Sequence, residues 1–168
     1  MLAGMKTLLV LRHAKADREE PLGSDHERTL TKKGAKAARK MGEILRENRL
    51  VPELVLSSTA ERARGTAELT AGEAGYQAKI DLLPELYLAE PPAYLEALRR
   101  LGGEAARVLV VGHNPGIEAL IFRLTGEAEH MPTAALAECE LPIESWSELT
   151  SEVRGTLSNV WRPREVDE

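Results

Sequence analysis

The feature that most constrains the fold is residues 7–15, which read Thr-Leu-Leu-Val-Leu-Arg-His-Ala-Lys. A short apolar run rich in Leu and Val and bounded by charge is typical of a buried β-strand. The run ends abruptly at Arg12 and His13, and Lys15 follows. In open α/β sheets, ligands bind in the crevice beyond the carboxyl ends of the strands. If the chain forms such a sheet, Arg12 and His13 lie where its chemistry takes place.

The same arrangement, a short apolar run followed by a basic or imidazole side chain, occurs twice more. Leu54–Ser57 predicts a second strand, and Arg62 follows it. Arg107–Val111 is the clearest buried strand in the sequence, and it leads through Gly112 into His113. Because the carboxyl ends of parallel strands meet at one edge of a sheet, we expect these side chains to converge with the first pair.

Helices are expected between the strands. Thr31 can cap a helix through its hydroxyl, and apolar residues then recur at helical spacing to about Asn48. Ser58 and Glu61 match a capping box, in which each side chain satisfies a backbone donor of the other residue. This match predicts a helix from Ser58 to about Ala74, with Arg62 on its first turn.

Two further helices are expected in the second half of the chain. Leucines at helical spacing follow Pro91 and Pro92, and Gly102 ends this segment. Asn114 followed by Pro115 fits the N-cap and first position of an apolar helix that extends to about residue 125.

The alternation of strands and helices predicts a three-layer α/β/α sandwich around a largely parallel sheet. The C-terminal third is less clear, although residues 134–141 and 153–161 could each hold a strand. The chain has 168 residues, of which 43% are hydrophobic, and it lacks internal repeats and long linkers. We therefore expect one domain over residues 1–168.

Composition excludes several classes of partner and site. A formal net charge of -5 argues against nucleic acid as a partner, because nucleic-acid-binding proteins usually carry a basic surface. The single Cys139 provides neither an intrachain disulfide nor a cysteine cluster for a metal. No apolar run approaches the roughly 18 residues of a membrane span, and the first residues do not resemble a signal peptide. A soluble, cytoplasmic protein with no membrane partner is expected.

Two guanidinium groups and two imidazoles in one cluster suit a dianionic phosphoryl group, because Arg is a permanently charged bidentate donor. A neutral His has a free lone pair and can be a nucleophile. If His13 has this role, its other ring nitrogen should donate to a backbone carbonyl. The alternatives are structural: a hydrogen bond at a strand end for His13, surface salt bridges for the arginines, and an ordinary loop position for His113. His26 and His130 lie in polar stretches and are expected at the surface.

Four segments together resemble the histidine phosphatase superfamily, which has the phosphoglycerate-mutase-like fold, and within it the short bacterial SixA-type phosphohistidine phosphatases. The matching segments are Leu11–Lys15, Arg28–Gly34, Ser57–Ala63 with Thr66, and Val110–Pro115. They occur in the family's order over most of the first 125 residues. Ala14 stands where many members have Gly, which is a small change.

The resemblance implies a role for each residue of the cluster. His13 would be the phosphorylated nucleophile. The phosphoryl group would be held by three further side chains: Arg12, Arg62 and His113. Arg28 and Lys15 are candidate substrate contacts. Neither a metal nor a cofactor is expected, because Arg12, Arg62 and His113, if protonated, can neutralise the phosphoryl charge as a Mg²⁺ ion does elsewhere.

The resemblance favours one substrate class over another. Relatives that act on sugar or glycerate phosphates are usually longer, with insertions that cover the site and supply an acidic proton donor. This chain has little room for such a lid, and Glu85 is only a weak candidate for the acid. We therefore expect removal of phosphate from protein phosphohistidine. The alternatives are a small-molecule phosphomonoesterase of the same superfamily and a non-catalytic phosphoprotein-binding module, although a binding module needs no histidine nucleophile.

Overall fold

The computed structural model describes residues 4–18 and 23–166. Its strands are β1 (Lys6–Arg12), β2 (Leu54–Ser58), β3 (Ile80–Leu83), β4 (Arg107–Gly112), β5 (Leu136–Leu141) and β6 (Thr156–Trp161). Its α-helices are α1 (Lys32–Glu47), α2 (Glu61–Ala74), α3 (Pro91–Leu101), α4 (Gly116–Thr125) and α5 (Pro163–Val166). Short 3-10 helices are η1 (Asp25–Glu27), η2 (Pro84–Leu86) and η3 (Trp146–Glu148). Within the described ranges, no helix is both long enough and apolar enough to cross a membrane.

The six strands form one sheet in the order β3-β2-β4-β1-β5-β6. Strands β1, β2, β3 and β4 pair in parallel, whereas β5 pairs antiparallel with both β1 and β6. The expectation of a largely parallel sheet is therefore confirmed, and the two C-terminal strands are its antiparallel part. The strands that end in the predicted site residues, β2, β4 and β1, are consecutive neighbours in the sheet.

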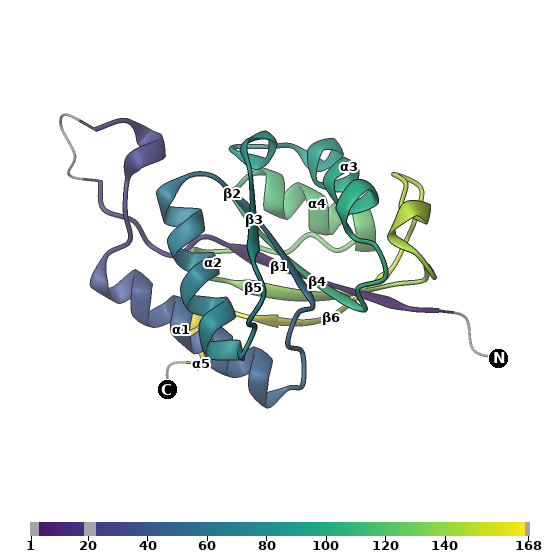
Figure 1. Ribbon diagram of the computed structural model, residues 1–168, viewed down its shortest axis with the longest axis horizontal. Coiled ribbons are helices and arrows are strands. Elements are labelled where there is room, and N and C mark those ends of the chain that lie inside the picture. The colour runs from purple at the N-terminus through teal and green to yellow at the C-terminus, as the bar shows by residue number, and fades with distance from the viewer. Residues whose placement is uncertain (1–3, 19–22, 167–168) are drawn as a thin grey trace.

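Helices cover both faces of this sheet, which confirms the three-layer sandwich. Figure 1 shows α3 and α4 on one face and α1 and α2 on the other. Leu8 and Val10 pack with the α3 and α4 side, whereas Leu9 and Leu11 pack with the α1 and α2 side. All four side chains are fully buried, since successive strand residues point to opposite faces and both faces are covered. Full burial of each such side chain contributes roughly 1.5–3 kcal/mol.

Helix α2 begins later than the sequence predicts, and the predicted capping box is wrong. Ser58 is the last residue of β2, where it pairs with Leu83 of β3. The N-cap residue of α2 is Ala60, which makes no side-chain cap. Strand pairing and complete burial take precedence over the local capping signal, so the Ser58 hydroxyl is directed into the protein interior.

The N-cap prediction is also wrong at Asn114 but is confirmed at Thr31. The N-cap position of α4 is occupied by Pro115, so the helix begins at Gly116. The Asn114 amide instead donates to the Met131 carbonyl and a Glu118 carboxylate oxygen, at 2.9 Å each. At α1, the Thr31 hydroxyl oxygen accepts from the backbone N–H of Gly34 at 2.9 Å.

Candidate active site

A cavity of about 970 Å³ lies beyond the carboxyl ends of β1, β2 and β4. Its lining includes all six residues that the sequence predicts for the site: Arg12, His13, Lys15, Arg28, Arg62 and His113. The sheet therefore brings together side chains that are up to 101 positions apart, from Arg12 to His113. This is the place where parallel α/β sheets bind ligands.

The two histidines of the cluster face one another. The centroids of the His13 and His113 rings are 5.2 Å apart, with the ring planes tilted by 54°. Only 7% of His13 and 1% of His113 is exposed. The predicted convergence of these residues at one sheet edge is therefore confirmed.

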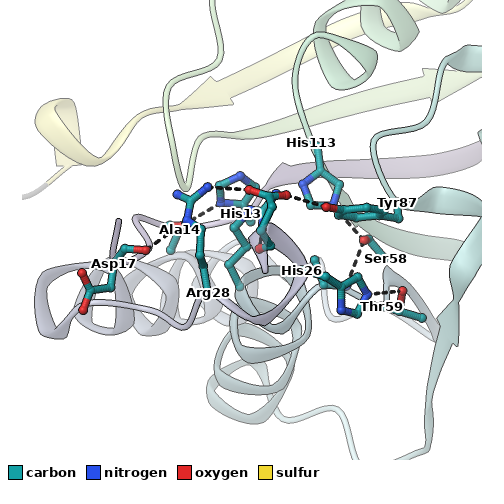
Figure 2. Close-up of polar contacts among 12 residues, drawn as sticks. His13, Ala14, Asp17, His26, Arg28, Ser58, Thr59, Tyr87 and His113 are labelled. Atoms are coloured by element: carbon teal, nitrogen blue, oxygen red, sulfur yellow. Dashed lines mark hydrogen bonds and ion pairs between the residues drawn. The ribbon is translucent and has the colours of Figure 1, made fainter. Parts of the chain in front are cut away.

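The hydrogen bond of His13 determines which ring nitrogen is free. His13 Nδ1 lies 2.8 Å from the backbone oxygen of Ala14 (Figure 2). Because a carbonyl oxygen only accepts, Nδ1 carries the hydrogen and Nε2 keeps its lone pair. Burial, with a further contribution from Arg62 and Arg12, lowers the pKa of His13 to about 4. The imidazole is therefore neutral at pH 7, as a nucleophile requires.

The turn that carries His13 is fixed to both neighbouring elements. The His13 backbone N–H donates to the Gly112 carbonyl at 3.0 Å, which joins the end of β1 to β4. The Ala14 N–H donates to the Thr66 hydroxyl oxygen at 2.8 Å, and that hydroxyl donates to the Arg62 carbonyl at 2.7 Å. The position of His13 relative to the first turn of α2 is thus set by hydrogen bonds at its own backbone.

Arg62 is only 3% exposed and makes a bidentate contact with Asp25. One guanidinium nitrogen donates to the Asp25 carboxylate at 2.9 Å, and the other donates to the Asp25 backbone oxygen at 2.7 Å. Arg28 donates to the second carboxylate oxygen at 2.8 Å, and the Tyr87 hydroxyl donates to the first. The Tyr87 hydroxyl and both arginines hold the pKa of Asp25 well below its usual range. Asp25 is therefore an anion beside Arg62 and Arg28, two of the cations that line the cavity.

Ser58 and Tyr87 contact His113 from two sides. The Ser58 hydroxyl oxygen is 2.7 Å from His113 Nε2, and the Tyr87 ring meets the imidazole edge-on with 5.5 Å between centroids (Figure 2). Burial and the proximity of His13 lower the pKa of His113 to about 3. In the ligand-free site both histidines are therefore neutral at pH 7.

Unpaired polar atoms gather in the same place. Across residues 4–18 and 23–166, the buried side-chain nitrogen and oxygen atoms without a hydrogen-bond partner are Arg12 Nε, His113 Nδ1 and Asn114 Oδ1. Leaving a buried polar atom unpaired costs on the order of 1–3 kcal/mol. An oxyanion beside Arg12 can accept the hydrogen bond that this guanidinium lacks.

Three further sequence expectations have different outcomes. His26 is not a free surface histidine, since its Nε2 is 2.8 Å from the Thr59 hydroxyl and its ring meets Tyr87 edge-on. His130 is on the surface, with 79% of its side chain exposed. Glu85 is absent from the cavity lining and pairs with Arg100 at 2.8 Å, so it is poorly placed to donate a proton there.

Sequence reasoning did not identify Asp25, Ser58 and Tyr87 as parts of the site. The Ser58 motif gave a stronger signal for a helix cap, and Tyr87 is in a loop with no motif of its own. Asp25 could have been found as an acidic residue three positions before Arg28, a spacing that allows the observed ion pair. In the part of the chain that is described, no three His, Cys, Asp or Glu side chains come together as a metal site requires.

Comparison with known proteins identifies the family. The model of the histidine phosphatase superfamily, branch 1, matches residues 8–87. An uncharacterized protein of Mycobacterium leprae is 34% identical over 137 residues, which cover 79% of this chain and 81% of that protein.

Solved structures agree in fold. A Nakamurella multipartitia protein assigned as the phosphohistidine phosphatase SixA superposes with a TM-score of 0.85 at 29% identity, over 96% of this chain and 98% of that one. The protein histidine phosphatase SixA in complex with tungstate has a TM-score of 0.78 at 28% identity, over 95% of this chain and 99% of that one. These matches extend well beyond the range of the family model, and the cluster of Arg12, His13, Arg62 and His113 lies at the sheet edge they share. The chain belongs to the histidine phosphatase superfamily.

Proposed function

We propose that this chain is a metal-independent phosphatase that uses His13 as its nucleophile and removes the phosphoryl group from phosphohistidine in a protein. The observation that carries the proposal is the hydrogen bond from His13 Nδ1 to the Ala14 carbonyl oxygen at 2.8 Å. It leaves a lone pair on Nε2 in a cavity that Arg12 and Arg62 also line. A neutral imidazole beside two permanent cations is suited to attack a phosphoryl dianion, because the cations offset the charge on its oxygens.

In the first step, Nε2 of His13 attacks phosphorus and the bond between phosphorus and the substrate nitrogen breaks. The electron pair of that bond goes to the leaving imidazole, which takes a proton from water. Arg12, Arg62 and His113 hold the phosphoryl oxygens during the transfer. The two guanidinium groups thus provide the charge stabilisation that a Mg²⁺ ion gives in other phosphoryl transfers.

In the second step, water attacks phosphorus on the phosphorylated His13 and the bond from phosphorus to Nε2 breaks. Inorganic phosphate leaves, and the proton lost by the water passes to solvent. The imidazole returns to the neutral form that its lowered pKa favours. A cavity of about 970 Å³ is large enough to admit the water that this step consumes.

The need for a proton donor favours a nitrogen leaving group over an alkoxide at this site. Asp25 has a pKa well below its usual range because Tyr87, Arg28 and Arg62 stabilise its anion, so it does not donate a proton at neutral pH. An alkoxide needs such a donor, since its conjugate acid is extremely weak; water, for scale, has a pKa of about 15.7. The conjugate acid of imidazole has a pKa near 6.5, so phosphohistidine needs little help.

The similarity to proteins named as SixA supports the same substrate class. One observation favours a small-molecule phosphomonoesterase instead, because a cavity of about 970 Å³ also accommodates a sugar phosphate. Of these two substrate classes, the leaving-group chemistry favours phosphohistidine.

The test compares kcat/KM values for three substrates: a protein carrying phosphohistidine, a phosphoserine peptide and a sugar phosphate. We expect phosphohistidine to be turned over at least about tenfold faster in kcat/KM, a margin of roughly 1.4 kcal/mol in the barrier. Each assay is run with and without EDTA, and the rates should agree because the charge stabilisation comes from arginines.

Faster turnover of the sugar phosphate or of phosphoserine would assign the chain to the phosphomonoesterase alternative. Binding of phosphoprotein without release of phosphate would indicate the non-catalytic module. Loss of activity in EDTA that a divalent metal restores would contradict the metal-independent mechanism.

A further inference from the structure

The first half of α1 carries a row of basic side chains on one face. Lys33, Lys36 and Lys40 are three and four positions apart, which places them next to one another on a helix. Helix α5 lies beside α1 (Figure 1) and contributes Arg164. These four residues, termed here the α1 basic face, line a cavity of about 220 Å³ together with Ala37 and Pro163.

Within the described part of the chain, no ion pair neutralises the charges of the α1 basic face. The ion pairs found among residues 4–18 and 23–166 have Arg or His as their cation, and none of them includes Lys33, Lys36, Lys40 or Arg164. The chain as a whole is acidic, with a formal net charge of -5. A local basic surface on an acidic protein is therefore a feature that its composition does not explain.

The position of these lysines is also unfavourable for the helix. No acidic residue lies in the first turn of α1, whose N-terminus already carries a partial positive charge. Lys32 and Lys33 begin the helix, and like charges three and four positions apart repel one another. These residues weaken α1, and an anionic partner that binds them reverses the effect.

The α1 basic face begins close in sequence and structure to residues that line the active-site cavity. The Thr31 backbone N–H donates to the carbonyl of Lys15 at 3.0 Å, which holds the start of α1 against the chain just beyond His13. Gly34 packs so closely on the Lys15 backbone that a side chain at position 34 has no room. Lys15 and Thr31 themselves line the cavity, together with Arg18 and Arg28. The basic residues thus extend from the catalytic cluster along α1.

We infer that the α1 basic face docks an acidic surface of the protein whose phosphohistidine enters the cavity. The inference rests on the proposed function and adds to it the chemistry of the partner. An acidic protein surface suits these residues better than a nucleic acid, because the net negative charge of the whole chain repels a long polyanion. Exposed ion pairs are individually weak, at about 0.2–1 kcal/mol each, so the contribution requires several pairs and weakens in salt.

The test uses two synthetic peptides that each contain one phosphohistidine and a flexible spacer. One peptide ends in a run of glutamates and the other in a run of glutamines, and spacers of several lengths are compared. For the wild-type protein we expect a KM about tenfold lower for the glutamate peptide at low salt, with equal kcat. This preference should shrink as salt is added. Free phosphohistidine serves as the substrate that does not reach α1.

The informative variant replaces the three lysines of α1: Lys33→Glu, Lys36→Glu and Lys40→Glu. Glutamates at positions 33 and 36 are favourable near the helix N-terminus and offset the like-charge spacing that the variant keeps, so we expect thermal stability close to that of the wild type. It should lose the preference for the glutamate peptide and keep its turnover of free phosphohistidine. A matched control changes the charge equally at positions away from α1: Lys6→Glu, Lys79→Glu and Arg123→Glu. The control should keep the preference.

Two results overturn the inference: an unchanged preference in the α1 variant, or an equal loss in the control, which points to net charge alone. Tighter binding of a single-stranded RNA oligonucleotide than of the glutamate peptide would also overturn it. Binding of the unphosphorylated glutamate peptide, followed by fluorescence anisotropy, separates docking from catalysis. If it binds the wild type but not the α1 variant, while no phosphohistidine is cleaved, the proposed function fails and the docking surface stands.

Discussion

At the scale of single residues, the two histidines differ in which nitrogen is committed to a partner. His13 uses Nδ1 for the Ala14 carbonyl, whereas His113 uses Nε2 for the Ser58 hydroxyl and has an unpaired Nδ1. Equivalent side chains in one cavity can therefore have different roles. His13 presents the lone pair of Nε2, and His113 is available to hydrogen-bond a phosphoryl oxygen.

The negative charge of Asp25 would oppose the binding of phosphate, because it lies against two arginines that line the cavity. Its carboxylate contacts Arg62 at 2.9 Å and Arg28 at 2.8 Å. We expect Asp25→Asn to tighten the binding of inorganic phosphate by about two- to fivefold, or ~0.5–1 kcal/mol, as for a partly exposed ion pair. The amide oxygen of Asn can still accept from Arg62, so the guanidinium keeps its position.

The measurement for this variant is the inhibition constant of inorganic phosphate at low salt. Asp81→Asn, in β3, removes the same charge away from the cavity lining and should leave the inhibition constant unchanged. Weaker phosphate binding by Asp25→Asn would mean that Asp25 is needed chiefly to hold the arginines in place.

Whether the sequence predicted a site residue depended on whether that residue lies at the end of a strand or in a loop. Arg12 ends a buried strand, and His13 and His113 directly follow buried strands, so strand order predicts where they meet. Asp25 reaches Arg62 across 37 positions from a 3-10 helix in a polar loop, and no periodic pattern marks such a contact.

At the scale of elements, the end of β2 carries two buried serines that differ in their contacts. Ser57 and Ser58 are both completely buried, but only Ser58 contacts a cluster residue, through its hydroxyl 2.7 Å from His113 Nε2. The Ser57 hydroxyl donates instead to the Ser58 carbonyl at 2.9 Å. The two neighbouring serines therefore form a matched pair for mutation.

We expect Ser58→Ala to lower kcat/KM by about tenfold, because a lost partner of a buried group costs on the order of 1–3 kcal/mol. Ser57→Ala removes a hydroxyl of similar burial and should reduce thermal stability by a comparable amount while leaving kcat/KM close to wild type. Equal losses of kcat/KM in the two variants would show that Ser58 acts only through the stability of the strand.

The starts of α2 and α4 show why two local capping signals gave wrong predictions. Ser58 and Asn114 both have side chains that cap helices well in isolation. In the folded chain, each contacts a residue farther along the sequence: His113 for Ser58, and Met131 for Asn114, whose amide also donates to Glu118 four positions away. The Thr31 hydroxyl also donates to a distant residue, the Lys15 carbonyl at 3.3 Å, but its oxygen still accepts from the Gly34 N–H and so caps α1 as predicted. Contacts that close only in the tertiary structure are not visible to a local pattern.

At the scale of the whole molecule, the buried histidines couple the site to the pH dependence of stability. The pKa values of His13 and His113 in the folded protein are about 4 and about 3, against about 6.5 in the unfolded chain. Between these values the unfolded chain binds more protons. The contribution of these two histidines to the free energy of unfolding is therefore fully present above about pH 6.5. It is lost as the pH falls from there towards the pKa values of the folded protein.

The corresponding measurement is the melting temperature between pH 7 and pH 4.5, for the wild type and for His13→Asn. The Asn amide can donate to the Ala14 carbonyl but does not titrate. The melting temperature of the variant should therefore decrease less on acidification than that of the wild type. Asp25 does not interfere in this window, because its pKa lies well below its usual value. Parallel curves for the two proteins would contradict the assigned neutral state of His13.

In the proposed mechanism, His13 Nε2 carries the phosphoryl group between substrate and water. Rapid quenching of the wild-type protein in base during turnover of phosphohistidine, followed by peptide mass spectrometry, tests it directly. We expect a phosphoryl group on Nε2 of His13 in the wild type, with neither this adduct nor turnover in His13→Asn. Substantial turnover by His13→Asn, or a wild-type phosphoryl group on any other residue, would contradict it.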